Sequence, residues 1–479
     1  MFLKSFIPRH ARESYRWDSR SVWLFGLYAG FTTPFFGVIA RRMGANNFEM
    51  EMLVASTAIG NVIAMFVACL MQNRQKMPYL FWLNSVGRGM LVLMAFATTR
   101  PEFVFLVFTS QLLSCLAGPA YAMIMKDAYP DDCRGQVMGT VRIGMTLAMM
   151  VAGLYAGKLM DTGLPWWWVV LFTLAAAFLI SGEVQGIRNK ILVGAGVVAL
   201  GLLAIPLLAY RLDYRVVFPV GGVLGVLSIW MFTHMYEKPV PPPDVQENTR
   251  ANVGLYFHNL GHMFRVPIID WRFGLYCLAF LVFGFGNWLR GPLVPMLQVD
   301  ALQINDVTVG VLAMVTSAAS MGAYFAWGWL MDRFNPFFTL LAAFLLQGIV
   351  PLLFAWVAPD HMAVTIMVIA AVMQGLVGPG IELGALTAVF HFAKGEDIPI
   401  YMALHNFLVG IRGIIAPFLG TEVLLHMFRN ETPLQQLHSS FLVSAWIVWG
   451  GFLLMLPVVL LVIMPEKKRK MAGEMALRH

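Results

Sequence analysis

The sequence predicts an all-α integral membrane protein, and three observations lead to this fold class. Hydrophobic residues make up 59% of the 479 residues and charged residues only 12%, roughly half the charged share of a soluble domain. The mean hydropathy is +0.71. Apolar runs of about 18 residues or more, long enough to cross the hydrocarbon core as helices, recur along the whole chain, without the alternating pattern of membrane strands. A soluble domain and a β-barrel are therefore excluded.

The apolar runs predict fourteen transmembrane helices, because in lipid each backbone amide must be paired within its own segment. Eight are expected in the first half, near 21–40, 50–71, 78–98, 102–125, 137–160, 165–183, 190–210 and 215–236. Six are expected in the second half, near 272–294, 308–331, 337–357, 362–388, 400–425 and 439–464.

The distribution of basic residues predicts the orientation of these helices. The residues before the first span form a basic arm without a small-residue cleavage site, so the first span is retained; the arm contains Lys4, Arg9, Arg12, Arg16 and Arg20. Most of the 33 Lys and Arg residues fall on the side of the N-terminus. We therefore expect both termini in the cytoplasm of a cell whose plasma or inner membrane holds the protein. The net charge of +7 follows from this asymmetry, and no nucleic-acid partner is expected.

Cysteine and histidine spacing predicts no metal site, no disulfide and no cofactor. His258 and His262 have helical spacing but no third ligand nearby. A phosphate-binding Gly-rich Lys loop, a G-x-S-x-G turn and an H-E-x-x-H pair are all missing from the sequence, so we do not expect an enzyme. The cysteines lie mostly within spans and lack metal-ligand spacing; they are Cys69, Cys115, Cys133 and Cys277.

An internal repeat indicates two halves of similar design. Leu330-Met331 lies 260 residues after Leu70-Met71, each pair at the same end of an apolar helix. Gly378-Pro379 lies 260 residues after Gly118-Pro119, and Lys394-Gly395 has the same offset from Arg134-Gly135. A constant offset across separate elements is typical of the duplicated plan of many transporters.

The loop "GWLMDRFNP", residues 328–336, makes this resemblance specific. Gly328, Asp332 and Arg333 resemble the G-x-x-x-D-R motif that major facilitator superfamily transporters have between the second and third helices of each half. The corresponding "LMQNRQKMP" of the first half keeps only basic character, through Arg74 and Lys76. By topology the resemblance covers nearly the whole chain.

The resemblance implies two pseudo-symmetric bundles of six helices with a cytoplasmic linker between them. The first bundle would occupy residues 1–236, the amphipathic linker 237–271, and the second bundle with its basic cytoplasmic tail 272–479. The first half has two spans too many. They form a hairpin at about 162–212 inserted before the sixth core helix, or they follow that helix. We favour insertion, because "YRVVFPVGGVLGVLSIW" resembles a usual sixth helix.

The resemblance also implies gating residues. Asp332 with Arg333, in the loop that Gly328 begins, would pair near a cytoplasmic helix end when the outer side is open. An ordinary polar turn is the alternative. Arg142 and Glu382 belong to opposite halves, and we expect them to form a second ion pair in that state.

Charged residues at bilayer depth are costly and therefore predict a substrate and proton site. Arg412 lies near the midplane, where such transporters bind substrate, and a guanidinium suits a carboxylate or phosphate. Arg412 could instead brace neighbouring carbonyls or pair with Glu382. Glu382 is the candidate for proton coupling, since burial and a nearby arginine shift the protonation of a carboxyl in opposite directions. A permanent structural ion pair is the alternative.

Further polar residues are weaker candidates. His405 and Asn406 lie where they could contact substrate, although packing is the commoner role. Arg88 is expected to be structural, and Arg290 is expected near the outer surface with its charge reaching water. Packing is also the more common role for the remaining cavity candidates, Tyr28, Thr32, Thr33, Asn61, Gln111, Asn287 and Gln374.

These observations predict a monomeric secondary transporter that works by alternating access in the lipid bilayer. Its partners would be protons and a small organic solute, and Arg412 favours an anionic one. The direction of transport stays open, because "GMTLAMMVAGLYAG" in the fifth helix does not match the antiport signature of the superfamily. The alternative is a protein of the same fold that acts as a receptor, a scaffold or a lipid flippase.

Overall fold

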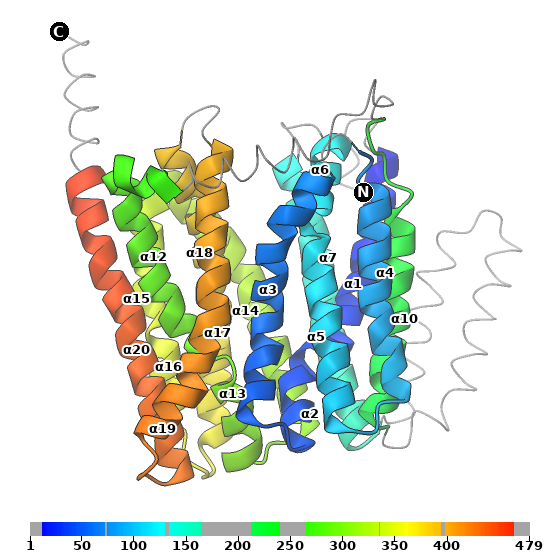
Figure 1. Cartoon of the computed structure of the whole chain (residues 1–479). Coiled ribbons are helices and arrows are strands. Elements are labelled where there is room, and N and C mark those ends of the chain that lie inside the picture. Colours follow the sequence, from blue (N-terminus) through cyan, green and yellow to red (C-terminus); the bar gives the residue numbers. More distant parts are fainter. Residues whose placement is uncertain are drawn as a thin grey trace, which may run out of the picture.

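The computed structural model describes residues 12–71, 74–129, 134–163, 212–239, 264–334, 336–393 and 398–463. Throughout these residues the regular structure is helical, and no strand occurs in them. Ten helices in the same ranges are long and apolar enough to cross a membrane. The helices stand side by side, as Figure 1 shows.

The helices of the first half follow the predicted spans. They are α1 (Arg12–Thr32), the 3-10 turn η3 (Thr33–Phe35), α2 (Phe36–Arg42), α3 (Asn47–Leu70), α4 (Met77–Val92), η4 (Leu93–Ala95), α5 (Arg100–Leu116), α6 (Gly118–Ala128), α7 (Arg134–Asp161) and α10 (Tyr214–Phe232). The predicted spans 165–183 and 190–210 lie outside the described residues.

The second half also follows the prediction. Its elements are α12 (Trp271–Leu289), α13 (Leu293–Met296), the π-helical turn η5 (Leu297–Ala301), α14 (Asp306–Arg333), α15 (Pro336–Gln347), α16 (Ile349–Ala355), α17 (Ala363–Phe392), α18 (Ile398–Phe418), η7 (Leu419–Leu424), α19 (Leu425–Met427), α20 (Pro433–Pro457) and η8 (Val458–Ile463). In the predicted linker, residues 264–269 are helical, and 240–263 lie outside the described residues.

The predicted count of fourteen spans is not confirmed. The predicted spans 50–71 and 78–98 correspond to α3 and α4. Neither α3 nor α4 belongs to the ten helices that are long and apolar enough to cross a membrane. Helix α4 has 16 residues, fewer than the roughly 18 that an α-helix needs to cross the hydrocarbon core. Only together with η4, which follows it directly, does it reach that length.

Local sequence explains where several helices begin and break. Thr99 and Glu102 form a reciprocal capping box at the start of α5, which satisfies amide groups that have no partner within the helix. The Asn305 side chain accepts a hydrogen bond from the Thr308 amide at the start of α14. Pro34 in η3 interrupts the first span between α1 and α2, because proline cannot donate a backbone hydrogen bond.

The helices pack in two groups. In the first group, α1 packs on α7 and α10, while α5 contacts both α3 and α4. In the second group, α12 packs on α18 and α20, and α17 packs on α14 and α15. Two extensive contacts join the groups, α7 with α14 and α3 with α18.

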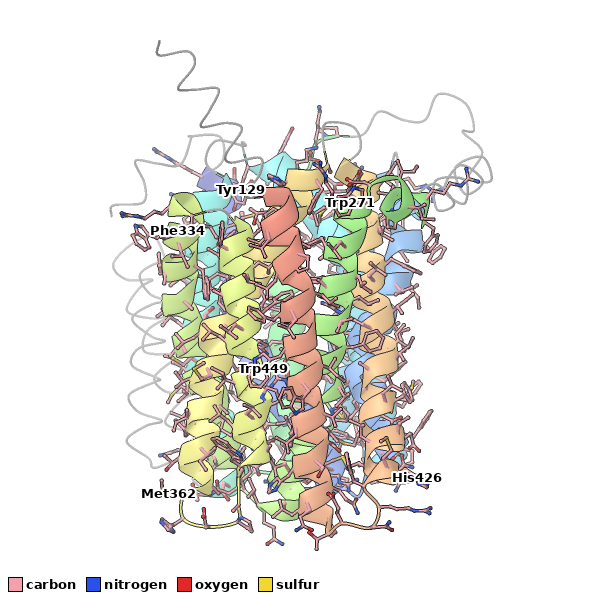
Figure 2. All side chains as sticks on the ribbon, turned by 90° about the vertical axis from the view of Figure 1, so that its left-hand side faces the viewer. Tyr129, Trp271, Phe334, Met362, His426 and Trp449 are labelled. Carbon is pink, nitrogen blue, oxygen red and sulfur yellow. The ribbon has the colours of Figure 1, made fainter. Side chains whose placement is uncertain are left out.

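We name the two ends of the molecule by their place in Figures 1 and 2. Figure 2 shows Tyr129, Trp271 and Phe334 at the upper end, and Met362 and His426 at the lower end. Helix α1 begins at the upper end (Figure 1). The upper end therefore corresponds to the side that the sequence predicts to be cytoplasmic.

Candidate functional site

A cavity of about 620 Å³, here called cavity A, lies mainly within the first group of helices. The second group contributes Tyr324 from α14 and Glu382 from α17 to its wall. Its polar and charged lining residues include Asp18, Ser21, Tyr28, Thr33, Thr57, Asn84, Arg88, Gln111, Ser114, Arg142, Thr146 and Ser228. Cavity A therefore combines four charged groups with hydroxyl and amide groups.

Arg88 on α4 is buried in the wall of cavity A. Its guanidinium donates hydrogen bonds to the Gly225 carbonyl at 2.8 Å, to Ser228 Oγ at 2.6 Å and to Asn84 Oδ1 at 3.2 Å. All three partners are neutral, and no carboxylate in the described part of the chain pairs with Arg88. The sequence predicts a structural role for Arg88. The structure shows in addition that Arg88 lines cavity A.

Aromatic rings cover the other side of this guanidinium. The Arg88 Cζ atom lies 4.9 Å from the centroid of the Phe25 ring and 5.4 Å from that of Tyr28, distances at which a cation is attracted to the ring face. The predicted candidates Tyr28 and Gln111 line cavity A, and their contact with substrate stays a prediction. Thr32 does not; its hydroxyl donates to the Tyr28 carbonyl at 2.8 Å.

Arg142 and Glu382 meet across the two helix groups. Arg142 Nη1 lies 3.1 Å from Glu382 Oε1, so the two residues that the sequence predicts to pair are in contact, while their gating role stays a prediction. Tyr324 Oη donates to the second oxygen, Glu382 Oε2, at 2.5 Å. The side chains of Arg142 and Glu382 are 49% and 53% exposed, so both are open to cavity A, whose wall they form.

Asp18 is a cavity residue that sequence reasoning missed. The prediction began the first span at residue 21, but α1 begins at Arg12 and places Asp18 inside the helix, with 1% of its surface exposed. Tyr129 Oη donates to Asp18 Oδ2 at 2.8 Å, while Oδ1 has no hydrogen-bond partner in the described part of the structure. Burial and the adjacent Asp18 raise the pKa of Tyr129, which therefore stays a hydrogen-bond donor. Asp18 could have been found from the sequence by extending the first helix back into the basic arm, where α1 in fact begins.

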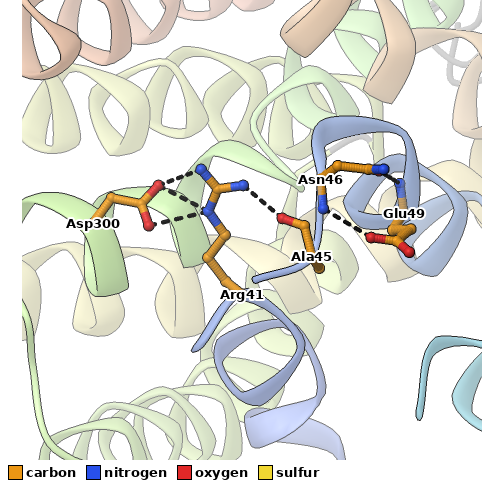
Figure 3. Close-up of polar contacts among 5 residues, drawn as sticks. All are labelled: Arg41, Ala45, Asn46, Glu49 and Asp300. Carbon is orange, nitrogen blue, oxygen red and sulfur yellow. Dashed lines mark hydrogen bonds and ion pairs between the residues drawn. The ribbon is translucent and has the colours of Figure 1, made fainter. Parts of the chain in front are cut away.

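Two ion pairs join the helix groups at the lower end. Arg41 holds both carboxylate oxygens of Asp300, with Nε at 3.0 Å from Oδ1 and Nη2 at 2.6 Å from Oδ2 (Figure 3). Arg42 Nη1 lies 2.7 Å from Asp306 Oδ1. Figure 3 also shows Arg41 donating to the Ala45 carbonyl, which ties the pair to the turn after α2.

Close helix packing accompanies these ion pairs. A Cβ atom added at Gly310 of α14 would lie 2.5 Å from the Gly153 carbonyl oxygen of α7. One added at Gly157 would lie 2.4 Å from the carbonyl oxygen of Asp306. Only glycine permits these approaches, and together with the ion pairs they close the lower end between the groups.

Arg290 corrects a prediction. It was expected near the outer surface, but only 9% of its surface is exposed. Its Nη2 atom donates to Asn287 Oδ1 at 2.9 Å and also to Gln374 Oε1. All three residues line a second cavity of about 360 Å³, here called cavity B. Asn287 and Gln374 thus line cavity B and not cavity A, and their predicted contact with substrate stays a prediction. The prediction for Arg290 is wrong because its side chain turns into the second helix group.

Arg412 lies within the second helix group. It is buried, donates through Nη1 to the Phe280 carbonyl, and places Cζ 4.4 Å from the centroid of the Phe280 ring. Neither cavity A nor cavity B is lined by Arg412, and it does not contact Glu382. The structure thus shows the bracing contact that was the alternative, and a substrate contact for Arg412 stays a prediction.

His405 and Asn406 differ in exposure. His405 is buried, with its ring centroid 4.6 Å from that of Phe280 and 5.9 Å from that of Tyr276, so it packs in the aromatic core of the second group. Asn406 is exposed. Neither residue lines cavity A or cavity B.

The motif residues lie at the upper end of α14. Arg333 is exposed and places its guanidinium 5.5 Å from the Trp329 ring centroid. A Cβ atom at Gly328 would meet nothing within 4 Å. Asp332 lies in the last turn of α14, and its side chain is outside the described part of the structure. The gating role of these three residues stays a prediction.

Solved structures of transporters share this fold. A variant of the nucleoside transporter NupG matches with a TM-score of 0.64 and 10% identity, covering 93% of this chain and 99% of that one. A bacterial homologue of the human lysosomal transporter Spinster, inward-facing and occupied, matches with a TM-score of 0.61 and 13% identity over 94% and 97% of the two chains. The E. coli fucose:proton symporter FucP matches with a TM-score of 0.53 and 13% identity over 94% and 99%.

Sequence comparison leads to the same family. No curated protein sequence matches the chain. The Major Facilitator Superfamily model matches residues 188–417 and 276–476, which together cover more than half of the chain. With its multi-pass helical fold, this protein is a membrane protein that belongs to the major facilitator superfamily.

Proposed function

We propose that this protein is a secondary transporter that binds a small organic solute in cavity A and moves it by alternating access. The observation that supports this function best is the position of cavity A. Its wall includes residues of both helix groups, and ion pairs and close helix packing hold those groups together at the lower end. A solute held between two groups that rock against each other is exposed to one side at a time.

We further propose two bundles of six helices, with the hairpin at 162–212 inserted before the sixth. Helix α10 packs on α1 and α4 of the first group, as a core helix would. With the upper end in the cytoplasm, a closed lower end makes this conformation inward-facing. The structurally similar Spinster homologue is inward-facing as well.

The lining of cavity A favours a polar solute with an anionic group. Arg88 supplies a buried positive charge whose partners in the described structure are all neutral, and a guanidinium binds a carboxylate or phosphate through paired hydrogen bonds. Phe25 and Tyr28 offer ring faces, and Gln111 offers an amide. The anionic character first inferred from Arg412 is thus supported by Arg88.

Protons are the proposed coupling ion, with Glu382 as the proton-binding residue. Glu382 contacts a donor, Tyr324, and a cation, Arg142, and it is half exposed at the wall of cavity A. A carboxyl in this position can exchange a proton with water, and protonation would weaken its attraction to Arg142. The structurally similar FucP is a fucose:proton symporter.

Ligand screening on the purified protein tests this function. A solute that binds only the folded protein raises the unfolding temperature, and a solute found in this way is then measured in proteoliposomes by exchange of labelled for unlabelled molecules. We expect exchange by the wild type and at least about tenfold weaker binding by Arg88→Gln, a loss of about 1.4 kcal/mol. Arg215→Gln, which removes a charge outside both cavities, should bind like the wild type.

The alternative is a receptor, scaffold or lipid flippase with the same fold. It predicts that no soluble solute both stabilises the protein and exchanges across the membrane. Lipid scrambling in the same proteoliposomes without solute exchange would establish the flippase and rule out the proposed function.

A further inference from the structure

Cavity B adjoins cavity A at the turn η3. Thr33 lines cavity A, and Pro34, the next residue of η3, lines cavity B. The rest of cavity B is formed by the second helix group, including Gln298 of η5 and Val309 of α14. The interrupted turn of the first span therefore separates the two cavities.

Arg290 is the one charged residue among those that line cavity B. It forms no ion pair with a described residue, and its Nε atom has no hydrogen-bond partner there. Arg42 at the lower end, by contrast, is paired with Asp306 at 2.7 Å. A buried arginine in a membrane protein requires a compensating negative group or water, and the described part of the chain provides no such group to Arg290.

The amide side chains around Arg290 are oriented by their hydrogen bonds. Asn287 Oδ1 accepts from Arg290 at 2.9 Å and from Gln347 Nε2 at 2.7 Å. Gln374 Oε1 accepts from Arg290 and, at 3.4 Å, from Gln347 Nε2. Because arginine can only donate, the amide oxygens must face it.

With their oxygens turned to Arg290, Asn287 and Gln374 each point an NH₂ group away from it, and this group is the only hydrogen-bond donor of the side chain. Neither NH₂ group has a hydrogen-bond partner among the described residues, and both residues line cavity B. Cavity B therefore presents a guanidinium and two amide donors, and none of the described residues that line it is a carboxylate. This arrangement suits an anion and disfavours a cation.

We propose that cavity B is a binding site for a small monovalent anion, a carboxylate group or a halide ion, held by Arg290, Asn287 and Gln374. A guanidinium binds either ion, and amide NH₂ groups complete the shell of donors. The site is separate from cavity A and does not depend on the solute proposed there. Because Pro34 belongs to the first helix group and the other lining residues to the second, the anion would lie between the groups that separate under the proposed alternating access.

Thermal unfolding of the purified full-length protein tests the proposal. Sodium chloride or sodium acetate replaces sodium HEPES at constant ionic strength, so that only the small anion changes. We expect the unfolding temperature of the wild type to rise with anion concentration and to follow a saturable curve, because a ligand of the folded state stabilises it by mass action. A response to acetate alone identifies a carboxylate site, and a response to both salts identifies a site that also takes halides.

Substitutions locate the site. Arg290→Gln should abolish the anion dependence, and the control change Arg215→Gln, at a half-buried arginine outside cavity B, should leave it intact. If the dependence survives in Arg290→Gln and disappears in Arg88→Gln, the anion binds in cavity A and the proposal is wrong. A wild-type unfolding temperature that does not respond to either salt also overturns it.

A second variant covers the case in which Arg290→Gln does not fold. Ala371 lines cavity B, and Ala371→Val narrows the cavity while Arg290 stays in place. We expect at least tenfold weaker anion binding in this variant. Binding as tight as that of the wild type would show that the anion does not occupy cavity B.

Discussion

Arg88, Arg290 and Arg412 are buried in helices of this protein, and their surroundings give them different properties. None forms an ion pair with a described residue, but Arg88 lines cavity A, Arg290 lines cavity B and Arg412 lines neither. Arg412 instead contacts the carbonyl and ring of Phe280. Burial alone therefore does not identify a ligand-binding arginine; access to a cavity is also required.

Arg412→Ala should lower stability. The change removes a buried hydrogen bond and a cation–ring contact and leaves a void, so we expect a loss of about 2–4 kcal/mol, seen as a lower unfolding temperature. Arg412→Met, which refills the space, should recover part of it. If Arg412→Ala unfolds at the wild-type temperature and yet loses solute exchange, Arg412 binds the solute in another conformation, as the sequence predicted.

Glu382→Gln should separate coupling from exchange. Glutamine keeps the size of the side chain and can still accept a hydrogen bond from Tyr324, but it cannot bind and release a proton at neutral pH. We expect accumulation driven by a pH gradient to fall to the background level while exchange of labelled for unlabelled solute continues. Gradient-driven accumulation at the wild-type level would assign the proton to another group, of which buried Asp18 is the first to test.

At the scale of elements, the contact between α7 and α14 depends on glycine. The backbone of α7 approaches Gly310 so closely that an added Cβ atom would lie 2.5 Å from the Gly153 carbonyl oxygen. Such a distance forces the helices apart. The same two helices belong to opposite groups, so the proposed alternating access requires them to separate when the lower end opens.

Gly310→Ala should therefore disfavour the closed lower end. Gly322→Ala is the matched control, because it lies on the same helix and an added Cβ atom there meets nothing within 4 Å. Spin-label distances between the lower ends of α7 and α14 should lengthen in Gly310→Ala and stay unchanged in Gly322→Ala. Equal distances in both variants would mean that neighbouring backbone shifts relieve the contact.

At the scale of the whole molecule, charged contacts join the two helix groups at separate heights. Arg41–Asp300 and Arg42–Asp306 lie at the lower end, and Arg142–Glu382 lies at the wall of cavity A. The structure therefore has the Arg142–Glu382 contact while the lower end is closed. The gating role that the sequence predicts for this pair stays a prediction.

Arg42→Ala should shift the protein toward a conformation with an open lower end. The Arg42–Asp306 pair is partly buried, with 31% and 8% of the side chains exposed, and a pair of this kind is worth about 1 kcal/mol, or roughly fivefold in population. Spin labels across the lower ends of the two groups measure this shift. Adding Asp306→Asn to Arg42→Ala should produce little further change, since the two residues act as a pair; independent, additive shifts would contradict that.

The sequence by itself determined the class, the order of the helices and the family. Each α-helix from α12 to α20 overlaps a predicted span, because a long apolar run is a local property that lipid and backbone hydrogen bonding convert into a helix. The motif with Asp332 and Arg333 and the repeat already indicated the superfamily. Tyr28, Gln111, Arg142 and Glu382 were also predicted, since polar residues inside apolar runs are few.

Only the tertiary structure decided which polar side chains share a cavity. Hydropathy averages over a whole run, whereas the direction of one side chain depends on how its helix is rotated against its neighbours. For this reason the sequence predicted Arg290 near the surface, left Arg412 open between a substrate contact and bracing of carbonyls, and did not single out Asp18. Packing of α12 against the second group turned Arg290 into cavity B, the early start of α1 brought Asp18 to cavity A, and the Phe280 carbonyl took the guanidinium of Arg412.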